Sequence, residues 1–423
     1  MSAAVHILCK ILCLILVTLQ VSADRKVSTK IFECTFNSTI CDGVSIAHIK
    51  SEGKNDARHY VLSPIGLPTV FVAYTGPGAA LIINWTNLVS PDPAKRQNSI
   101  KIVNTTVNYS FSILFSKLIE YNDTQDYADM SKYNAGSTHW NMYDLQDFSW
   151  EKLSTVSDIK SNSITFKASD KTQQELWKNN GTFSIKFNAF GSEGREDQLP
   201  HLQYNENLTQ FDMNIDHIMT NFTDSRFAVE ILTVGGDSEP MYVDKTRSID
   251  DEYAPGVFQI YNWMTRSNHR DQTGFLQWKP VAYNALKRAR NKATSMKHYA
   301  LQDLTMDQKN QVDDTIVYAF YGETVLDKSM KKAQNFSFGI AKDGGYNKTR
   351  VLTWSGSIGY GSPPADAIST VVIIIILAGL GLPIVIIIFG GIFVCMKKRS
   401  NRPDKQLKAV NSTGYQPILD SDR

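Results

Sequence analysis

The sequence predicts an all-β protein: an antiparallel, sandwich-type β domain on the lumenal side of a membrane, then one transmembrane helix in type I topology. Short segments in which apolar and polar residues alternate recur between residues 69 and 357. Glycine- and proline-containing turns separate these segments, and two long apolar segments lie near the ends of the chain. Alternation with a period of two is typical of strands that bury one face, and many short strands favour packed antiparallel sheets.

The first apolar segment, residues 1–23, is typical of a secretory signal peptide. Its apolar centre runs from Ile11 to Leu19, and Val21, Ser22 and Ala23 provide the small residues of a cleavage site after Ala23. A short apolar core that ends in small residues is the pattern that signal peptidase recognises. Lys10 interrupts the apolar stretch, so an uncleaved signal anchor is the alternative interpretation.

Residues 24–366 form the expected lumenal, glycosylated, β-rich domain. In the segment 182–189, for example, Phe183, Ile185 and Phe187 alternate with polar residues. Strands are expected at residues 69–74, 80–85, 100–119, 163–168, 182–189, 211–217, 227–234, 257–263, 275–283, 315–321, 335–340 and 351–357. Helix signals are few: residues 172–178 fit a short helix, and residues 285–306 fit a helix or a mobile loop. One sandwich unit and two such units both fit this pattern.

Cysteine is scarce in the expected lumenal domain. The chain has 5 cysteines, too few for a disulfide-rich scaffold or a zinc array. Two of them leave with the signal peptide, and only Cys34 and Cys41 lie between the signal peptide and the membrane segment. In an oxidising compartment we expect them to form a disulfide, which would contribute about 2.5 kcal/mol by closing a short loop. Two free thiols are the alternative.

Asn-x-Ser/Thr sequons are frequent in this domain. The expected N-glycosylation sites are Asn37, Asn84, Asn104, Asn108, Asn122, Asn180, Asn207, Asn221, Asn335 and Asn347. A single sequon is a weak signal, but so many of them predict a heavily glycosylated surface, since glycans require exposed backbone. We expect partial occupancy, in particular within the close pair Asn104 and Asn108.

The second apolar segment, residues 371–395, contains no charged residue. As a helix it would be roughly 37 Å long, which exceeds the ~30 Å hydrocarbon layer of a bilayer. Lys397, Lys398 and Arg399 follow it, so the positive-inside rule places residues 396–423 in the cytosol. Cys395 lies at the cytosolic edge of the membrane, where it is either a palmitoylation site or a small residue that ends the helix.

The cytosolic tail contains Gly414-Tyr415-Gln416-Pro417-Ile418. An extended peptide with a tyrosine and a large apolar residue three positions later fits the two pockets of a strand-addition receptor. We interpret Tyr415 and Ile418 as a sorting signal that clathrin adaptors read for delivery to lysosomes. A chance match is the alternative, because the pattern specifies only two side chains.

Catalytic motifs are missing from the sequence, and the predicted protein is not an enzyme and needs no cofactor or metal. The strongest candidate for chemistry is the run Asp250, Asp251 and Glu252, which could bind Ca²⁺ or act as a general acid and base. Neighbouring residues of an extended chain point to opposite faces, so a structural role in a loop is the favoured interpretation. The balanced charge, 44 basic and 42 acidic residues, argues against a nucleic-acid partner.

Two aromatic clusters could stack on sugars, but packing in the core is the favoured interpretation because large aromatic side chains usually bury surface. The clusters are Trp140, Tyr143, Phe148 and Trp150, and Phe275, Trp278 and Tyr283.

The chain resembles the glycosylated lysosomal membrane protein family. The longest matching motifs are Ser248 to Pro255 (SIDDEYAP) and Gln277 to Tyr283 (QWKPVAY). Further matches lie at residues 84–86, 90–93, 147–150, 257–259, 335–339, 352–355 and 363–366, in the membrane segment and at Tyr415 and Ile418. The resemblance extends from about His59 to the tail. Family members from vertebrates carry several lumenal cysteines in the second half, and this chain has none there.

This resemblance implies a non-enzymatic protein of the lysosomal membrane. It would be an accessory subunit of a multi-spanning major facilitator transporter that exports dipeptides, bound through the lumenal domain. It would protect the transporter from proteolysis and support its lysosomal localisation. A homo-oligomer is compatible with the sequence. The alternatives are a membrane-anchored lysosomal hydrolase that uses Asp250, Asp251 or Glu252, and a cargo-sorting receptor that cycles through lysosomes.

Overall fold

The computed structural model describes residues 25–34, 39–41, 43–133, 139–157, 161–169, 176, 180–248, 257–365 and 370–400. The expected signal peptide, Asn37, the acidic run at Asp250 to Glu252 and the sorting signal at Tyr415 and Ile418 lie outside these residues. The β-rich residues belong to one compact unit that ends at Asp366, and the C-terminal helix belongs to a second unit.

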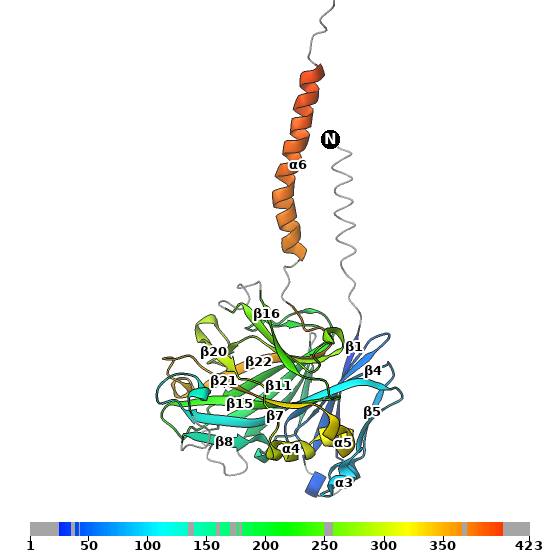
Figure 1. Ribbon diagram of the computed structural model, residues 1–423, viewed down its shortest axis with the longest axis vertical. Helices are drawn as coiled ribbons and strands as arrows, with labels where there is room; N and C mark the ends of the chain where they lie inside the picture. Colours follow the sequence, from blue (N-terminus) through cyan, green and yellow to red (C-terminus); the bar gives the residue numbers. More distant parts are fainter. Residues whose placement is uncertain are drawn as a thin grey trace, which may run out of the picture. The chain divides into compact units, whose positions relative to one another are not determined.

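Antiparallel strands build the β-rich unit (Figure 1). The first layer contains β1 (Lys26–Glu33), β2 (Ser45–Glu52), β3 (Ala57–Ser63), β4 (Thr69–Thr75), β7 (Val107–Asn122), β8 (Trp140–Asp144), β15 (Ser225–Gly235) and β21 (Lys331–Phe338). The second layer contains β9 (Ser154–Ser157), β10 (Ser161–Ser169), β11 (Thr182–Phe190), β14 (Leu208–Asp216), β16 (Tyr242–Arg247), β17 (Gln259–Met264), β18 (Gly274–Trp278), β19 (Val281–Tyr283) and β22 (Val351–Tyr360). The strand β20 (Ala293–His298) pairs with β19 in the second layer and with β21 in the first, so the two layers form one nearly closed sheet.

Alternation along the first layer divides its side chains between two cores. Tyr60 and Leu62 of β3 face the second layer and join the main core, which also contains Trp263, Trp278 and Trp354. The intervening residues of the first layer belong to a second core on its other face. Because both faces of β3 are covered, all of its residues are buried.

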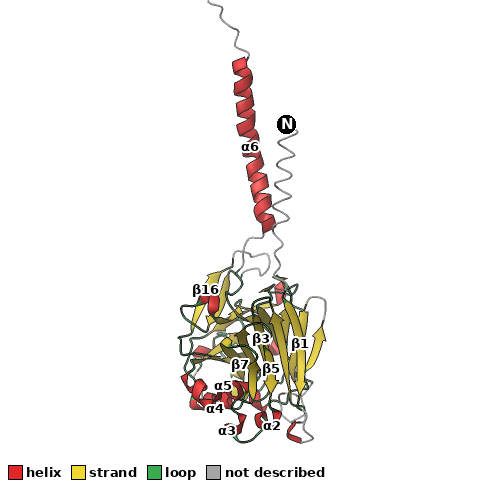
Figure 2. Ribbon diagram, turned by 90° about the vertical axis from the view of Figure 1, so that its right-hand side faces the viewer, coloured by secondary structure: helices red, strands yellow, loops and turns green. Residues whose placement is uncertain are grey.

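Helices cover the outer face of the first layer. They are α4 (Met306–Asp313) and α5 (Ile316–Lys328), and they lie beside β7 in Figure 1. Ile316 and Val317 of α5 pack in the second core with Val61 and Phe71. Smaller elements complete this part of the unit: β5 (Ala80–Ile83) pairs with β6 (Ile100–Val103), and the chain segment that connects them contains α2 (Trp85–Leu88) and α3 (Pro93–Arg96). Both helices lie below β5 in Figure 2.

The predicted strand at residues 315–321 is wrong, because these residues form the start of α5. Their β-branched and aromatic side chains favour a strand locally. The helix forms nevertheless because the Thr315 side chain caps it, accepting from the Val317 N–H, and because its apolar face is buried on the sheet. Gly322, at φ 67°, breaks the helical conformation within α5.

The all-β class and the antiparallel packing are confirmed, with differences in detail. The expected strand at 100–119 is divided into β6 and β7, the one at 275–283 into β18 and β19, and β1 to β3 precede the first expected strand. Residues 285–306, predicted as a helix or a loop, contain β20. The predicted helix at 172–178 lies outside the described residues, apart from Leu176.

The second unit contains the helix α6 (Thr370–Ser400), which continues the apolar segment expected to cross the membrane. Ile373–Arg399 is long and apolar enough to span a bilayer, with a mean hydropathy of 3.0. Most of its described apolar side chains are exposed in the isolated chain, as expected for a helix that faces lipid. Cys395 is an exposed free cysteine near the C-terminal end of this helix.

Candidate functional site

The predicted glycan sites lie on the surface wherever the structure describes them. Asn84, Asn104, Asn108, Asn180 and Asn221 are exposed. The remaining described sites are half-buried, and these are Asn122, Asn207, Asn335 and Asn347. The five exposed positions fit the steric need of N-linked glycans.

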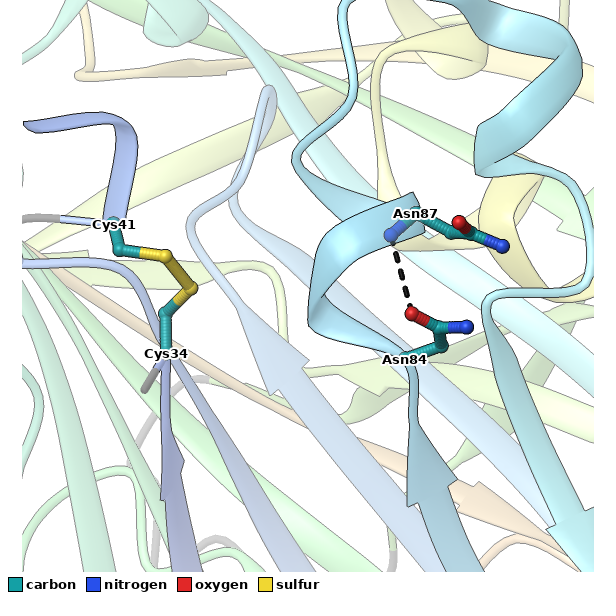
Figure 3. The surroundings of a disulfide bond; sticks show 4 residues. All are labelled: Cys34, Cys41, Asn84 and Asn87. Carbon is teal, nitrogen blue, oxygen red and sulfur yellow. Dashed lines mark hydrogen bonds between the residues drawn. A yellow bond between two sulfur atoms is a disulfide. The ribbon is translucent and has the colours of Figure 1, made fainter. Parts of the chain in front are cut away.

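Asn84 caps a helix with its side-chain oxygen and leaves its side-chain nitrogen available for a glycan. It is the N-cap of α2, and its Oδ1 accepts a hydrogen bond from the Asn87 N–H at 3.2 Å (Figure 3). The cap therefore uses the side-chain oxygen, whereas a glycan is carried by the nitrogen.

The disulfide predicted between Cys34 and Cys41 is present (Figure 3). It connects the residue after β1 with a short 3-10 helix, Thr39–Cys41, and the two Cα atoms are 5.4 Å apart. The Cys34 N–H also donates to the Val44 carbonyl, so the loop is closed by a backbone hydrogen bond as well. The disulfide thus closes the connection between β1 and β2.

The part of the chain between Asn221 and Asn335 contains no sequon. It includes β15 to β20, and its surface is hollowed by a groove of about 490 Å³ between β17 and β20. The groove is lined by Val257, Phe258, Gln259, Tyr261, Pro280, Ser295, Met296, Lys297 and His298. We refer to these residues as the β17–β20 groove.

Tyr261 and His298 form an aromatic wall of the groove, and this wall packs against buried residues of the main core. The Tyr261 ring stacks on buried Trp278, with centroids 5.8 Å apart, and its centroid is 4.3 Å from that of His298. Trp278 is fully buried and packs edge-on against Phe336, so this wall is anchored in the main core. By contrast, the Phe258 side chain at the rim is 51% exposed. An exposed aromatic residue beside a fixed aromatic wall is typical of a recognition surface.

Two lysines lie at the groove, and one of them is paired with a carboxylate. Lys245 lies over the Tyr261 ring at 5.8 Å, and Lys297 forms an ion pair with Asp129 at 2.5 Å. Burial, and secondarily the charge of Lys245, lowers the pKa of His298. None of the described residues that line the groove is acidic. The exposed Phe258 and the Tyr261 ring make the groove suited to an apolar side chain of an extended peptide.

A buried ion cluster that local sequence patterns do not reveal fastens two loops to β15. Arg226 of β15 is 3% exposed, and it forms ion pairs with Asp123 at 2.5 Å, Asp126 at 2.6 Å and Asp343 at 2.7 Å. Burial opposes the ionisation of Asp343, but the N–H groups of Ile340 and Gly345 and the charge of Arg226 lower its pKa. The partners lie 100 to 117 residues from Arg226 in the chain, so local patterns could not reveal them.

The comparisons with known proteins agree with the motifs. The model of the family described as Glycosylated lysosomal membrane protein matches residues 45–401. This chain belongs to the glycosylated lysosomal membrane protein family. A relative from Danio rerio with that name is 31% identical over 380 residues, which cover 89% of this chain and 88% of the relative. Glycosylated lysosomal membrane protein B of Xenopus laevis is 31% identical over 90% of this chain and 93% of its own length. The Homo sapiens protein is 29% identical over 83% and 84%.

Membership of the glycosylated lysosomal membrane protein family confirms the resemblance that the motifs predict, and it identifies a glycoprotein of the lysosomal membrane. The name denotes no enzymatic activity. Among the described residues, no group of three or more histidine, cysteine or acidic side chains is arranged to hold a metal ion.

Both aromatic clusters contribute to packing. Phe275, Trp278 and Tyr283 are buried, and Phe148 is buried beside Trp150, which packs against the main core. Phe258, the exposed aromatic residue at the rim of the β17–β20 groove, belongs to neither cluster, so this groove is the candidate binding site among the described residues.

Proposed function

We propose that this protein is a non-enzymatic accessory subunit of a multi-spanning major facilitator transporter, such as a dipeptide exporter, in the lysosomal membrane. Its β-rich unit would cover lumenal segments of the transporter and protect them from proteases. The complex would remain in lysosomes longer than the transporter alone.

One observation carries this proposal: the β17–β20 groove lies in the part of the chain that has no sequon, while sequons are frequent in the rest of the β-rich unit. A glycan beside a protein interface would obstruct docking, whereas glycans elsewhere would shield the exposed face from proteases. A groove on a sequon-free segment fits the docking face of a protective subunit, and the sequon nearest to it along the sheet is Asn335 on β21, the strand that pairs with β20.

The buried ion cluster is consistent with work in an acidic compartment. Because the pKa of Asp343 is lowered, its ion pair with Arg226 persists at acidic pH. The loops that carry Asp123, Asp126 and Asp343 thus stay fastened where proteases are active.

The direct test is to delete the protein and follow the transporter in lysosomes with active proteases. We expect the transporter's abundance to fall severalfold and protease inhibitors to restore it. Unchanged abundance would falsify the proposal.

The role of the groove is tested with a matched pair of variants in the full-length protein. Phe258→Asp places a charge at the rim of the groove, and Ile82→Asp places one on an equally exposed residue of β5, since the two are 51% and 52% exposed. We expect only Phe258→Asp to weaken co-purification of the transporter in mild detergent. Equal co-purification of both variants would exclude the groove as the contact surface.

The topology belongs to the same proposal. The predicted signal peptide and the positive charges after the apolar segment of α6 support a lumenal N-terminus and a cytosolic C-terminus. Tyr415 and Ile418 would then face clathrin adaptors in the cytosol, and Cys395 would be accessible to palmitoylation at the membrane edge.

A further inference from the structure

The side-chain nitrogen of Asn347 donates both of its hydrogens, although Asn347 begins a sequon. Its Nδ2 donates to the carbonyl oxygens of Phe222 at 3.0 Å and Thr223 at 2.7 Å. Its Oδ1 accepts from the Thr220 hydroxyl at 2.7 Å. Two carbonyl groups can only accept, so they fix which end of the amide is nitrogen.

An N-linked glycan is incompatible with this arrangement. The amide nitrogen of asparagine has two hydrogens, and both are donated here. Glycosylation replaces one hydrogen with the first sugar carbon, so at least one carbonyl would lose its donor and the sugar would occupy that donor's position.

Asn221 and Asn84 differ from Asn347 in this respect. The Nδ2 of Asn221 donates to the Glu120 carboxylate at 2.9 Å, but its other contact is the Tyr143 hydroxyl, which can reorient. Asn84 uses only its oxygen as the N-cap of α2. Asn347 therefore differs from these two asparagines, because its side-chain nitrogen donates to two backbone carbonyl groups.

The hydrogen bonds of Asn347 fix a turn whose backbone donates a hydrogen bond to the buried carboxylate of Glu120. Residues 220–223 connect β14 with β15, and the Asn221 backbone N–H of this turn donates to Glu120 at 2.7 Å. Glu120 is fully buried and also accepts from the Ser225 hydroxyl. If the turn moved, Glu120 would lose hydrogen bonds that compensate its burial.

We propose that Asn347 stays unglycosylated in the mature protein and acts as a clamp that fixes the Thr220–Thr223 turn beneath Glu120. Oligosaccharide transfer acts on the extended chain, before these bonds exist. A chain that received a glycan at Asn347 could not complete the turn, so the folded population carries the free amide.

Two variants separate the sequon from the amide. Thr349→Ala removes the sequon and keeps Asn347, at the expense of one long hydrogen bond from the Thr349 hydroxyl to the Val351 carbonyl at 3.3 Å. Asn347→Asp removes the sequon and also replaces the donor with a carboxylate that faces two carbonyl oxygens. Thr86→Ala, which removes the Asn84 sequon, is the control for loss of one glycan.

The measurements are the gel mobility and the thermal unfolding of the full-length glycoprotein. We expect Thr86→Ala to increase mobility by one glycan and Thr349→Ala to leave both mobility and Tm unchanged. Asn347→Asp should keep the mobility and lower the Tm by about 2 to 4 °C, because two carbonyl oxygens lose their donor and face a carboxylate instead.

Site-specific mass spectrometry after enzymatic deglycosylation in heavy-oxygen water provides a second readout. We expect no conversion of Asn347 and clear conversion of Asn84. A glycan on Asn347 of the folded protein, or a mobility shift in Thr349→Ala, would overturn the inference. If Asn347→Asp does not fold, Thr220→Val removes only the hydroxyl donor, and an unchanged Tm in that variant would refute the clamp.

Discussion

The imidazole rings of His48 and His59 are stacked in the interior of the first layer, with Nε2 of His48 2.9 Å from Nδ1 of His59. The other nitrogen of His59 bonds the Thr75 hydroxyl at 3.0 Å. Burial lowers the pKa of His48 to about 3, helped by His59, Lys50 and Lys30. Burial, with Lys50, lowers the pKa of His59 to about 4. Neither ring carries a proton in the folded protein at mildly acidic pH.

This pair predicts that the protein loses stability on acidification. The unfolded chain takes up protons near pH 6.5, whereas the folded chain resists them until about pH 4. The stabilisation of the folded protein by the two neutral histidines is therefore complete above pH 6.5 and decreases as the pH falls. Between pH 7 and pH 5, each histidine should lower the free energy of unfolding by about 2 kcal/mol.

Chemical denaturation of His59→Gln at pH 7 and pH 5 checks this prediction. We expect the variant to show a smaller loss on acidification than the natural protein. His217→Gln is the control, because the His217 side chain is 55% exposed. An identical pH dependence in all three proteins would contradict the assignment to the buried pair.

Arg226 predicts a large effect of a single substitution. Arg226→Met leaves Asp123, Asp126 and Asp343 without their shared cation, and Asp123 and Asp343 are themselves buried or largely covered. Removal of one partner of a buried ion cluster costs about 3 to 5 kcal/mol. Denaturant unfolding of the purified glycoprotein measures this loss.

Arg270→Met is the matched control, since Arg270 is 58% exposed and pairs with Asp244 at the surface. We expect its effect to stay below about 1 kcal/mol. Equal losses in the two variants would show that the buried cluster has no special role.

The membrane segment predicts how the protein fractionates. We expect alkaline carbonate to leave the protein in the membrane pellet, because residues 371–395 contain no charge. Removal of N-glycans should increase its gel mobility by several glycan masses. Release by carbonate, or an unshifted band, would contradict a transmembrane glycoprotein.

The sorting signal predicts the effect of a tail substitution. Tyr415→Ala removes the side chain that a clathrin adaptor would bind, so the protein should accumulate at the plasma membrane. Surface biotinylation measures this shift, and Gln416→Ala, at a position that the pattern leaves open, serves as the control. If Tyr415→Ala stays in lysosomes, a bound partner directs the sorting instead.

The features that the sequence determined by itself depend on local composition. The uncharged segment 371–395 is sufficient for a membrane span, sequons are three-residue patterns, and alternation along β11 and β14 identifies half-buried strands. The disulfide between Cys34 and Cys41 was also predictable, because the expected lumenal domain offers no other pair.

Tertiary structure decided the features that depend on which distant segments meet. Residues 315–321 became helical because they cover the outer face of the first layer, against their local strand propensity. The β17–β20 groove, the Arg226 cluster and the clamp at Asn347 each join residues that local patterns do not connect. Hydrogen bonds and burial between distant segments carry no signal in the composition of either segment, so only the folded chain reveals them.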